Sequence, residues 1–248
     1  MRVVAIIPAR MASTRFPGKP LARIHGRSMI EHVYYRTKCS NLINDVYVAT
    51  CDIEIAKEVK KFKGNTIMTS HTHVRGNDRV AEAVKKLDTD LVINVQGDEP
   101  MVDPDSLDKA ITLMMDKTEV KCLNLISKIK DWDTFISQDV VKTTFDKNNR
   151  VLYFSREPIP SCAMDDFNNA YKQIGIYLVQ KELLLEYTKW DETPLEKKEK
   201  VDMLRFLENG ISIYSFLVKD MISVDLPEER IIVENLLSKD KLYNKLFK

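Results

Sequence analysis

The chain has 248 residues, of which 44% are hydrophobic and 30% are charged, a composition typical of a soluble globular protein with a substantial core. Its 38 basic residues are nearly balanced by 37 acidic ones, for a formal net charge of +1, which excludes capture of nucleic acid by a broadly basic surface. There is no signal-peptide pattern, no apolar run near the roughly 18 residues of a membrane helix, and no C-x-x-C pair among the four cysteines, so we expect a soluble cytoplasmic protein with reduced thiols.

Up to Pro100, short apolar runs alternate with amphipathic segments. Strands are predicted at Val3–Pro8, Asp45–Cys51, Asn65–Ser70 and Asp90–Gln96. Helices are predicted at Ser28–Cys39, Ile53–Phe62 and Asn77–Leu87. Strand and helix taking turns over about 20 to 25 residues is typical of a doubly wound parallel sheet. The sequence therefore predicts an α/β fold with a three-layer, mostly parallel sheet.

Beyond Pro100 the alternation loosens. Helices are predicted at 104–117, 181–190 and 197–210, with a last one starting at Pro227, and strands at 120–129, 140–146, 150–156, 173–179 and 211–218. Residues 158–172 have no clean period and are predicted to be an irregular excursion. The middle strands are separated by polar turns, which favours mixed or antiparallel pairing in a smaller lobe. We expect one domain over 1–248, with a first half over 1–100 and a second over 101–248.

The loop after the first strand concentrates positive charge. In IIPARMASTRFPGKPL (Ile6–Leu21), a buried strand is followed by Arg10, Arg15 and Lys19. Ligands of open parallel sheets bind beyond the carboxyl ends of the strands, and arginine and lysine grip phosphate oxygens. The loop has neither the dinucleotide-binding nor the P-loop glycine pattern. A solvated loop with ordinary surface cations is the alternative, but the position at a strand end favours a phosphate site.

Two adjacent acids follow the strand that ends at Gln96. In NVQGDEPMV, Asp98 and Glu99 come directly after Gly97, and such acids repel each other unless a cation or a donor is present. Mg²⁺ prefers one or two carboxylates together with water and substrate phosphates. The alternative is an acid that caps the helix starting at Pro104, a role that suits Asp103 better than Asp98.

Two further segments are weaker signals. In SVDLPEER, Asp225 precedes a helix start, and the motif alone favours helix capping over metal binding. His71 and His73 have a spacing that metal sites on strands can use, but no third histidine or cysteine is nearby, so a polar loop is favoured over zinc. Arg79 lies in the first turn of a predicted helix, against the helix dipole, which makes it a candidate substrate contact.

These segments occur together in one order. IIPARMASTRFPGKPL, RGNDRVAEA, NVQGDEPMV, LYFSREPIP, IGIY, PLE and VDLPEE resemble the 3-deoxy-manno-octulosonate (KDO) cytidylyltransferases, or CMP-KDO synthetases, from Ile6 to about Arg230. The resemblance implies a fold of the nucleotide-diphospho-sugar transferase type and a cytoplasmic homodimer. It also implies Mg²⁺-dependent transfer of CMP from CTP to an acidic sugar for lipopolysaccharide biosynthesis, with release of pyrophosphate. The second half would then serve the sugar and the dimer interface. CMP synthetases for sialic-acid-like sugars share the architecture and come second.

The resemblance also implies roles for individual residues. Metal ligands would be Asp98 and Asp225, and catalysis would rest on these two acids with Arg15 and Lys19. The nucleotide would be bound by Pro8, Ala9, Arg10, Ala12, Ser13, Lys19, Arg75, Gln96 and Asp98. The sugar would be bound by Arg15, Arg79, Gln96, Gln173, Tyr177, Glu196, Glu199 and Asp225. The anomeric hydroxyl would attack the α-phosphorus, with no covalent enzyme intermediate. For Asp225, the resemblance favours metal binding over helix capping.

The sequence departs from the family pattern near the expected sugar site. The family's Ser-Gly-Thr-Asp/Glu-Arg string is here Arg75–Arg79, its His-x-Gly-Ile-Tyr is Gln173–Tyr177, and its Glu-Gln-Leu-Arg is Asp202–Arg205. An extra arginine and an amide in place of histidine change which sugar substituents can be hydrogen-bonded, so a modified sugar such as 8-amino-KDO is a hypothesis. A non-catalytic nucleotide-binding module and a scaffold using the lysine-rich C-terminus are the alternatives from other classes.

Overall fold

The computed structural model describes residues 1–12, 15–73, 75–164 and 169–247. Ser13, a predicted nucleotide contact, lies outside these residues, as do 165–168 of the predicted irregular excursion. The chain divides into two compact units, one of Met1–Lys109 with Met221–Lys248 and one of Ala110–Asp220. The expected division was at residue 100. The first unit instead extends to Lys109 and also contains the C-terminal segment.

The first unit is built on a parallel sheet in the order β6–β1–β4–β5. Its strands are β1 (Val3–Ala9), β4 (Asp45–Thr50), β5 (Thr66–Met68) and β6 (Leu91–Val95). Every residue of β1 and β6 is buried, as expected for strands that are covered on both faces. The predicted strands and their parallel pairing are confirmed.

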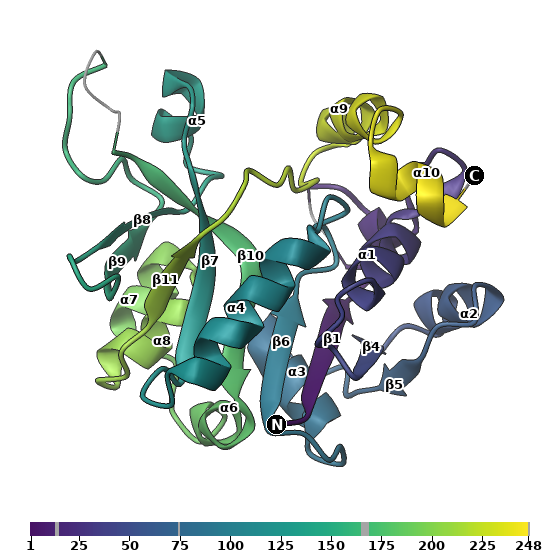
Figure 1. The fold of residues 1–248 in the computed structure, drawn as a ribbon, viewed down its shortest axis with the longest axis horizontal. Coiled ribbons are helices and arrows are strands. Elements are labelled where there is room, and N and C mark those ends of the chain that lie inside the picture. The colour runs from purple at the N-terminus through teal and green to yellow at the C-terminus, as the bar shows by residue number, and fades with distance from the viewer. Residues whose placement is uncertain (13–14, 74, 165–168, 248) are drawn as a thin grey trace. The chain divides into compact units, whose positions relative to one another are not determined.

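The helices of the first unit cover both faces of this sheet. They are α1 (Met29–Lys38), α2 (Ile53–Lys61), α3 (Gly76–Val84) and the beginning of α4 (Pro104–Asp116). The connection from β1 through α1 to β4 runs one way along the sheet, and that from β5 through α3 to β6 returns the other way. Since such crossovers are right-handed, α1 and α3 lie on opposite faces, in front of the sheet and behind it in Figure 1. The predicted α/β class is confirmed.

The C-terminal segment is fastened to the first unit by apolar packing. Its helices α9 (Pro227–Leu237) and α10 (Lys241–Phe247) lie beside the small hairpin of β2 (Arg23–Ile24) and β3 (Arg27–Ser28). The shared core consists of Ile24, Met29, Val224, Val233, Leu237 and Tyr243. Buried Arg36 of α1 adds an ion pair to Asp240, with 2.9 Å between Nη1 and Oδ1. This packing determines where the segment that contains Asp225 lies.

The second unit has a mixed sheet, as predicted for the smaller lobe. Its strands are β7 (Cys122–Lys128), β8 (Lys142–Phe145), β9 (Val151–Ser155), β10 (Tyr171–Gln180) and β11 (Tyr214–Leu217). β7 pairs parallel with β11 and antiparallel with β10, and β8 pairs antiparallel with β9 and β10. Its helices are α5 (Trp132–Ile136), α6 (Lys181–Tyr187), α7 (Pro194–Glu199) and α8 (Met203–Glu208).

Two elements of the second unit differ from the prediction. The single helix expected over 197–210 is wrong: the chain forms α7 and α8, and Lys200 between them has φ 57°, in the left-handed region that ends a helix. The pattern also does not predict α5. All four cysteines are free thiols. Within the described ranges, no helix combines the length and the apolar composition that crossing a membrane requires.

Candidate active site

Two strand ends meet at the carboxyl edge of the first unit's sheet. β1 ends at Ala9 and its neighbour β6 ends at Val95, so the segments that follow them start side by side. At Gly97 the two segments are close, because a Cβ there would lie 3.0 Å from the carbonyl oxygen of Pro8. A side chain at this position would push the two segments apart. Glycine therefore lets Asp98 follow directly on the strand while remaining close to the loop after β1.

The loop after β1 turns back so that Lys19 faces Asp98. Gly18 has φ +69°, a conformation that glycine adopts without strain, and it precedes the short 3₁₀ helix η1 (Lys19–Leu21). Its backbone N–H donates to the carbonyl oxygen of Met11 at 3.3 Å. The loop is thus closed on itself, and Lys19 is directed toward the end of β6.

Asp225 reaches the same point from the C-terminal segment. The backbone N–H of Val224 donates to the carbonyl oxygen of Asp98 at 2.9 Å, which places the two acids together. Asp225 is not the N-cap of α9, a position held by Leu226; the capping interpretation is therefore wrong. Glu229 instead accepts the backbone N–H groups of Asp225 and Leu226 at 2.5 and 2.8 Å, which leaves the Asp225 carboxylate for other partners.

The Lys19 ammonium lies between the two acids. Its Nζ is 2.5 Å from Oδ2 of Asp98 and 3.0 Å from Oδ1 of Asp225, and Nη2 of Arg15 is 3.0 Å from the same Asp225 oxygen. Burial by itself lowers the pKa of Lys19, but the charges and hydrogen bonds of Asp98 and Asp225 outweigh it, so this pKa is raised above its ordinary value. Lys19 is therefore a fully charged cation held between two carboxylates.

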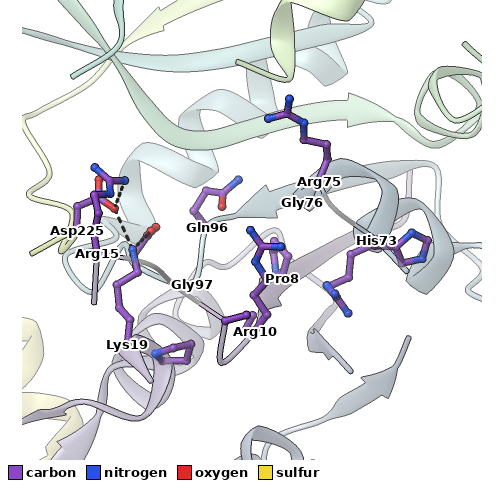
Figure 2. A pocket seen from close by; sticks show the side chains of 15 residues that line it. Pro8, Arg10, Arg15, Lys19, His73, Arg75, Gly76, Gln96, Gly97 and Asp225 are labelled. Carbon is purple, nitrogen blue, oxygen red and sulfur yellow. Dashed lines mark hydrogen bonds and ion pairs between the residues drawn. The ribbon is translucent and has the colours of Figure 1, made fainter. Parts of the chain in front are cut away.

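These residues line a cavity of about 320 Å³ in the first unit. Figure 2 shows Lys19, Arg15 and Asp225 together at one side, with Gln96, Arg10 and Pro8 next to them and Arg75 apart. The predicted site residues that line it are Pro8, Ala9, Arg10, Ala12, Arg15, Lys19, Arg75, Arg79, Gln96, Asp98 and Asp225. The structure thus brings together the predicted contacts of the first unit, Ser13 apart, which lies outside the described residues.

The far wall of the cavity comes from the segment around α3. Buried Arg79 donates through Nη1 to Oγ1 of Thr69 at 2.5 Å, so its orientation is fixed by the chain. His73 also lines the cavity, and its Nε2 pairs with the carboxylate of Glu82. Within 1–12, 15–73, 75–164 and 169–247, no three His, Cys, Asp or Glu side chains gather to hold a metal ion. His71 and His73 lie in a loop, as predicted.

The pair of acids fits a divalent cation bound jointly with substrate. Asp98 and Asp225 already hold one cation, since the Lys19 ammonium contacts an oxygen of each. Two carboxylates are the donor set through which Mg²⁺ is bound when substrate phosphates and water complete its shell. On the chemistry of these donors, the residues present fit the metal that the resemblance implies.

The predicted sugar contacts Gln173 and Tyr177 flank a bulge in the second unit. β10 shifts register against β7 between these two residues, and bulges of this kind redirect side chains. Asn124 of β7 holds the bulge, because its Nδ2 donates to the carbonyl oxygens of Ile174 and Ile176 at 3.1 and 3.0 Å. Tyr177 is buried and Gln173 is half-buried. Their contact with a sugar stays a prediction.

The structure engages both predicted glutamates in contacts within the second unit. Glu196 is 0% exposed, and its carboxylate receives Nε and Nη2 of Arg205 at 2.6 and 2.7 Å. Glu199 accepts Oγ of Ser155 at 2.9 Å and the backbone N–H of Arg156 at 2.8 Å. These bonds give the two glutamates structural partners: Glu196 joins α7 to α8, and Glu199 joins α7 to the end of β9.

Replacing Glu196 by glutamine is expected to destabilise the chain by about 3–5 kcal/mol, because it leaves the Arg205 charge buried without its partner. Urea unfolding of the variant measures this loss. Arg205→Met should cost a similar amount, and the double variant Glu196→Leu/Arg205→Met should recover most of it. A raised KM for the sugar with unchanged stability would instead show that Glu196 contacts substrate.

Two residues that line the cavity, Gly76 and Pro20, carry no signal of a ligand site in the local sequence pattern. His73 also lines it, although the sequence pattern favours a polar loop there. Asp52, outside the lining, accepts the backbone N–H of Met11 at 2.8 Å. Its position two residues after β4, at the same sheet edge, is the signal of this contact in the sequence.

Known proteins resemble the chain over nearly its whole length. A protein-family model for cytidylyltransferases matches residues 4–213. A 3-deoxy-manno-octulosonate cytidylyltransferase of Geobacter metallireducens is 41% identical over 92% of this chain and 95% of that protein. Its counterpart in Geobacter sulfurreducens is 40% identical over 97% of this chain and 100% of that protein. The solved structure of a CMP:2-keto-3-deoxy-manno-octonic acid synthetase complexed with CTP has a TM-score of 0.90 and 34% identity, and the match covers 96% of this chain and 99% of that one.

Proposed function

Since the chain belongs to the cytidylyltransferase family, we propose that this nucleotidyltransferase transfers CMP from CTP to KDO and releases pyrophosphate. The observation that carries the proposal is the cavity in which Arg15 and Lys19 meet Asp98 and Asp225, because it joins phosphate-binding cations to a pair of metal-binding acids. Relatives named for KDO support this sugar, and nothing favours the sialic-acid alternative.

The cationic side chains of the cavity bind the triphosphate of CTP. Arg10, Arg15 and Lys19 bind its oxygens, and arginine does so with two parallel N–H donors. The nucleoside lies against the ends of β1 and β6, where the contacts are Pro8, Ala9, Ala12 and Gln96. Arg75, before α3, is a further proposed contact, and Ser13 is retained as a prediction from the resemblance. Arg79 and Gln96 of the first unit are the proposed sugar contacts, and Gln173 and Tyr177 stay predictions from the resemblance.

The reaction is an in-line displacement at the α-phosphorus. The anomeric hydroxyl of the sugar forms a bond to this phosphorus, the bond to the bridging oxygen of the β-phosphate breaks, and the hydroxyl proton passes to solvent. Negative charge grows on the departing pyrophosphate, where Arg15 and Lys19 stabilise it. These side chains act by position and charge, and no covalent enzyme intermediate is needed.

Asp98 and Asp225 are the residues that hold Mg²⁺. When bound, the metal supplies positive charge that neutralises phosphate oxygens and orients them. The triphosphate gives Lys19 and Arg15 new anionic partners, and this frees the two carboxylates from their ion pairs with these cations. From the resemblance we further propose a cytoplasmic homodimer whose product is used for lipopolysaccharide synthesis.

The identity of the sugar is tested by a substrate panel. Wild-type protein, CTP and Mg²⁺ are incubated with KDO, 8-amino-KDO or sialic acid, and the CMP-sugar is measured by mass spectrometry. We expect CMP-KDO as the main product. Gln173 and Arg75 make 8-amino-KDO the second candidate, and KDO turnover far above that of the amino sugar would exclude it. Turnover of sialic acid with no product from either octulosonate would overturn the proposal.

A further inference from the structure

We infer that Asp52 is a positioning residue for the phosphate-binding loop, which it holds through the backbone of Met11. The inference rests on the proposed function, because it assigns the loop to the triphosphate of CTP. Asp52 does not line the cavity formed by the described residues, so it acts through another residue. It follows β4, which pairs with β1 up to Ala9 and Thr50, and it therefore starts beside the loop.

The first observation is that the Asp52 side chain does not cap the helix that it precedes. It is the N-cap of α2, but its side chain makes no capping hydrogen bond, although an aspartate there normally accepts from the first turn of the helix. Its Oδ2 instead accepts the backbone N–H of Met11 at 2.8 Å. The carboxylate is thus used for a contact 41 residues away in the chain rather than for its own helix.

The second observation is that Met11 is the point at which the loop closes. Its carbonyl oxygen accepts the backbone N–H of Gly18 at 3.3 Å, and Gly18 precedes η1, in which Lys19 is the first residue. The bonds thus run from Asp52 through Met11 and Gly18 to Lys19. Loss of the first bond removes one tie between the loop and the sheet edge, and the segment that leads to Lys19 is then held less firmly.

The third observation concerns charge. A carboxylate beside a loop that binds an anion repels that anion, so a carboxylate at this place needs a compensating role. The carboxylate of Asp52 accepts a backbone N–H, and its own backbone N–H donates to Oγ1 of Thr50 at 3.0 Å. Asp52 is thus held at both its side chain and its backbone N–H, as expected of a residue that orients the loop.

Two substitutions separate loop anchoring from helix capping. Asp52→Asn keeps the length and an oxygen that accepts the Met11 N–H, whereas Asp52→Ser keeps a good N-cap but is too short to reach it. Binding of inorganic triphosphate with Mg²⁺ is measured by calorimetry, and KM is measured separately for CTP and for the sugar. We expect Asp52→Ser to raise the triphosphate Kd and the KM for CTP about tenfold, with the sugar KM within about twofold. Asp52→Asn should restore both values.

Asp108→Ala is the matched control. Its carboxylate accepts the backbone N–H groups of Asn41 and Leu42 at 3.1 and 3.2 Å in the same unit, so its loss should lower stability without raising the triphosphate Kd. Equal triphosphate Kd values for Asp52→Ser and the wild type, or equal increases for Asp52→Ser and Asp108→Ala, would overturn the inference. Triphosphate binding that weakens in Asp52→Ser while KDO is not turned over would keep the inference and reject the proposed sugar.

Discussion

Replacing Asp98 or Asp225 by alanine is expected to lower kcat for pyrophosphate release at least about 10³-fold, which corresponds to about 4 kcal/mol of lost transition-state stabilisation. Each variant removes one of the two carboxylates that meet at Lys19 and that we assign to Mg²⁺. A single remaining carboxylate binds the metal weakly and does not fix its position on the phosphates. Steady-state kinetics over a range of Mg²⁺ concentrations measures both the loss and any shift in metal requirement.

The two acids are expected to act as a unit. The double variant should therefore be no more than about tenfold worse than the poorer single variant, because groups that serve one step are not additive. Asp103→Ala is the matched control: this acid lies on the same segment but caps α4, accepting the backbone N–H of Ser106 at 3.1 Å. Full activity in either Asp98→Ala or Asp225→Ala would remove that residue from the metal site.

Replacing Lys19 by methionine is expected to change two measured quantities in opposite directions. The value of kcat/KM for CTP should fall about 10²- to 10³-fold, because a preorganised cation is lost from the departing pyrophosphate. Binding of Mn²⁺ to the nucleotide-free protein, followed by electron paramagnetic resonance, should become several-fold tighter. The reason is that Nζ of Lys19 contacts both acids at 2.5 and 3.0 Å and so competes with a metal for the same oxygens.

An exposed lysine provides the comparison for this result. Lys86→Met removes the same charge from the surface of the first unit and should leave both the turnover of CTP and the Mn²⁺ affinity unchanged. If Lys19→Met lowers turnover but leaves the affinity for Mn²⁺ as it is in the wild type, the acids and the metal do not share a site. If it alters neither quantity, Lys19 has no part in the reaction.

The loop after β1 and Asp98 were predictable because their signals are local. A buried strand that ends in cations, and another that ends in Gly97 and Asp98, are visible in short stretches of sequence. Parallel pairing of β1 with β6 then brings the two strand ends together, as the alternating pattern indicates. The α/β class followed from the same alternation.

The position of Asp225 was not predictable from its own segment. The motif favoured helix capping, but Leu226 is the N-cap and Asp225 pairs with Lys19 across 206 positions. That pairing depends on the packing of α9 and α10 against the N-terminal hairpin, which no local period reports. The resemblance, rather than residue spacing, raised Asp225 to a site residue.

Other differences have the same origin in tertiary contacts. The break between α7 and α8 lies at Lys200, which is left-handed although it is not a glycine. No glycine therefore marks the break in the sequence, and the helix periodicity continues through it. No local pattern indicates that Glu196 is fully buried and paired with Arg205. The contact of Asp52 with Met11 becomes visible only when β4 and β1 are aligned.

The most direct test of the account is the stoichiometry of one reaction and its dependence on metal. Wild-type protein with CTP and KDO is assayed for pyrophosphate and for CMP-KDO, with Mg²⁺ and then with the metal removed by a chelator. We expect one pyrophosphate to form for each CMP-KDO with Mg²⁺. Formation of both products should stop in the chelator and recover when Mg²⁺ is restored. Pyrophosphate released without CMP-KDO, or equal turnover in the chelator, would contradict it.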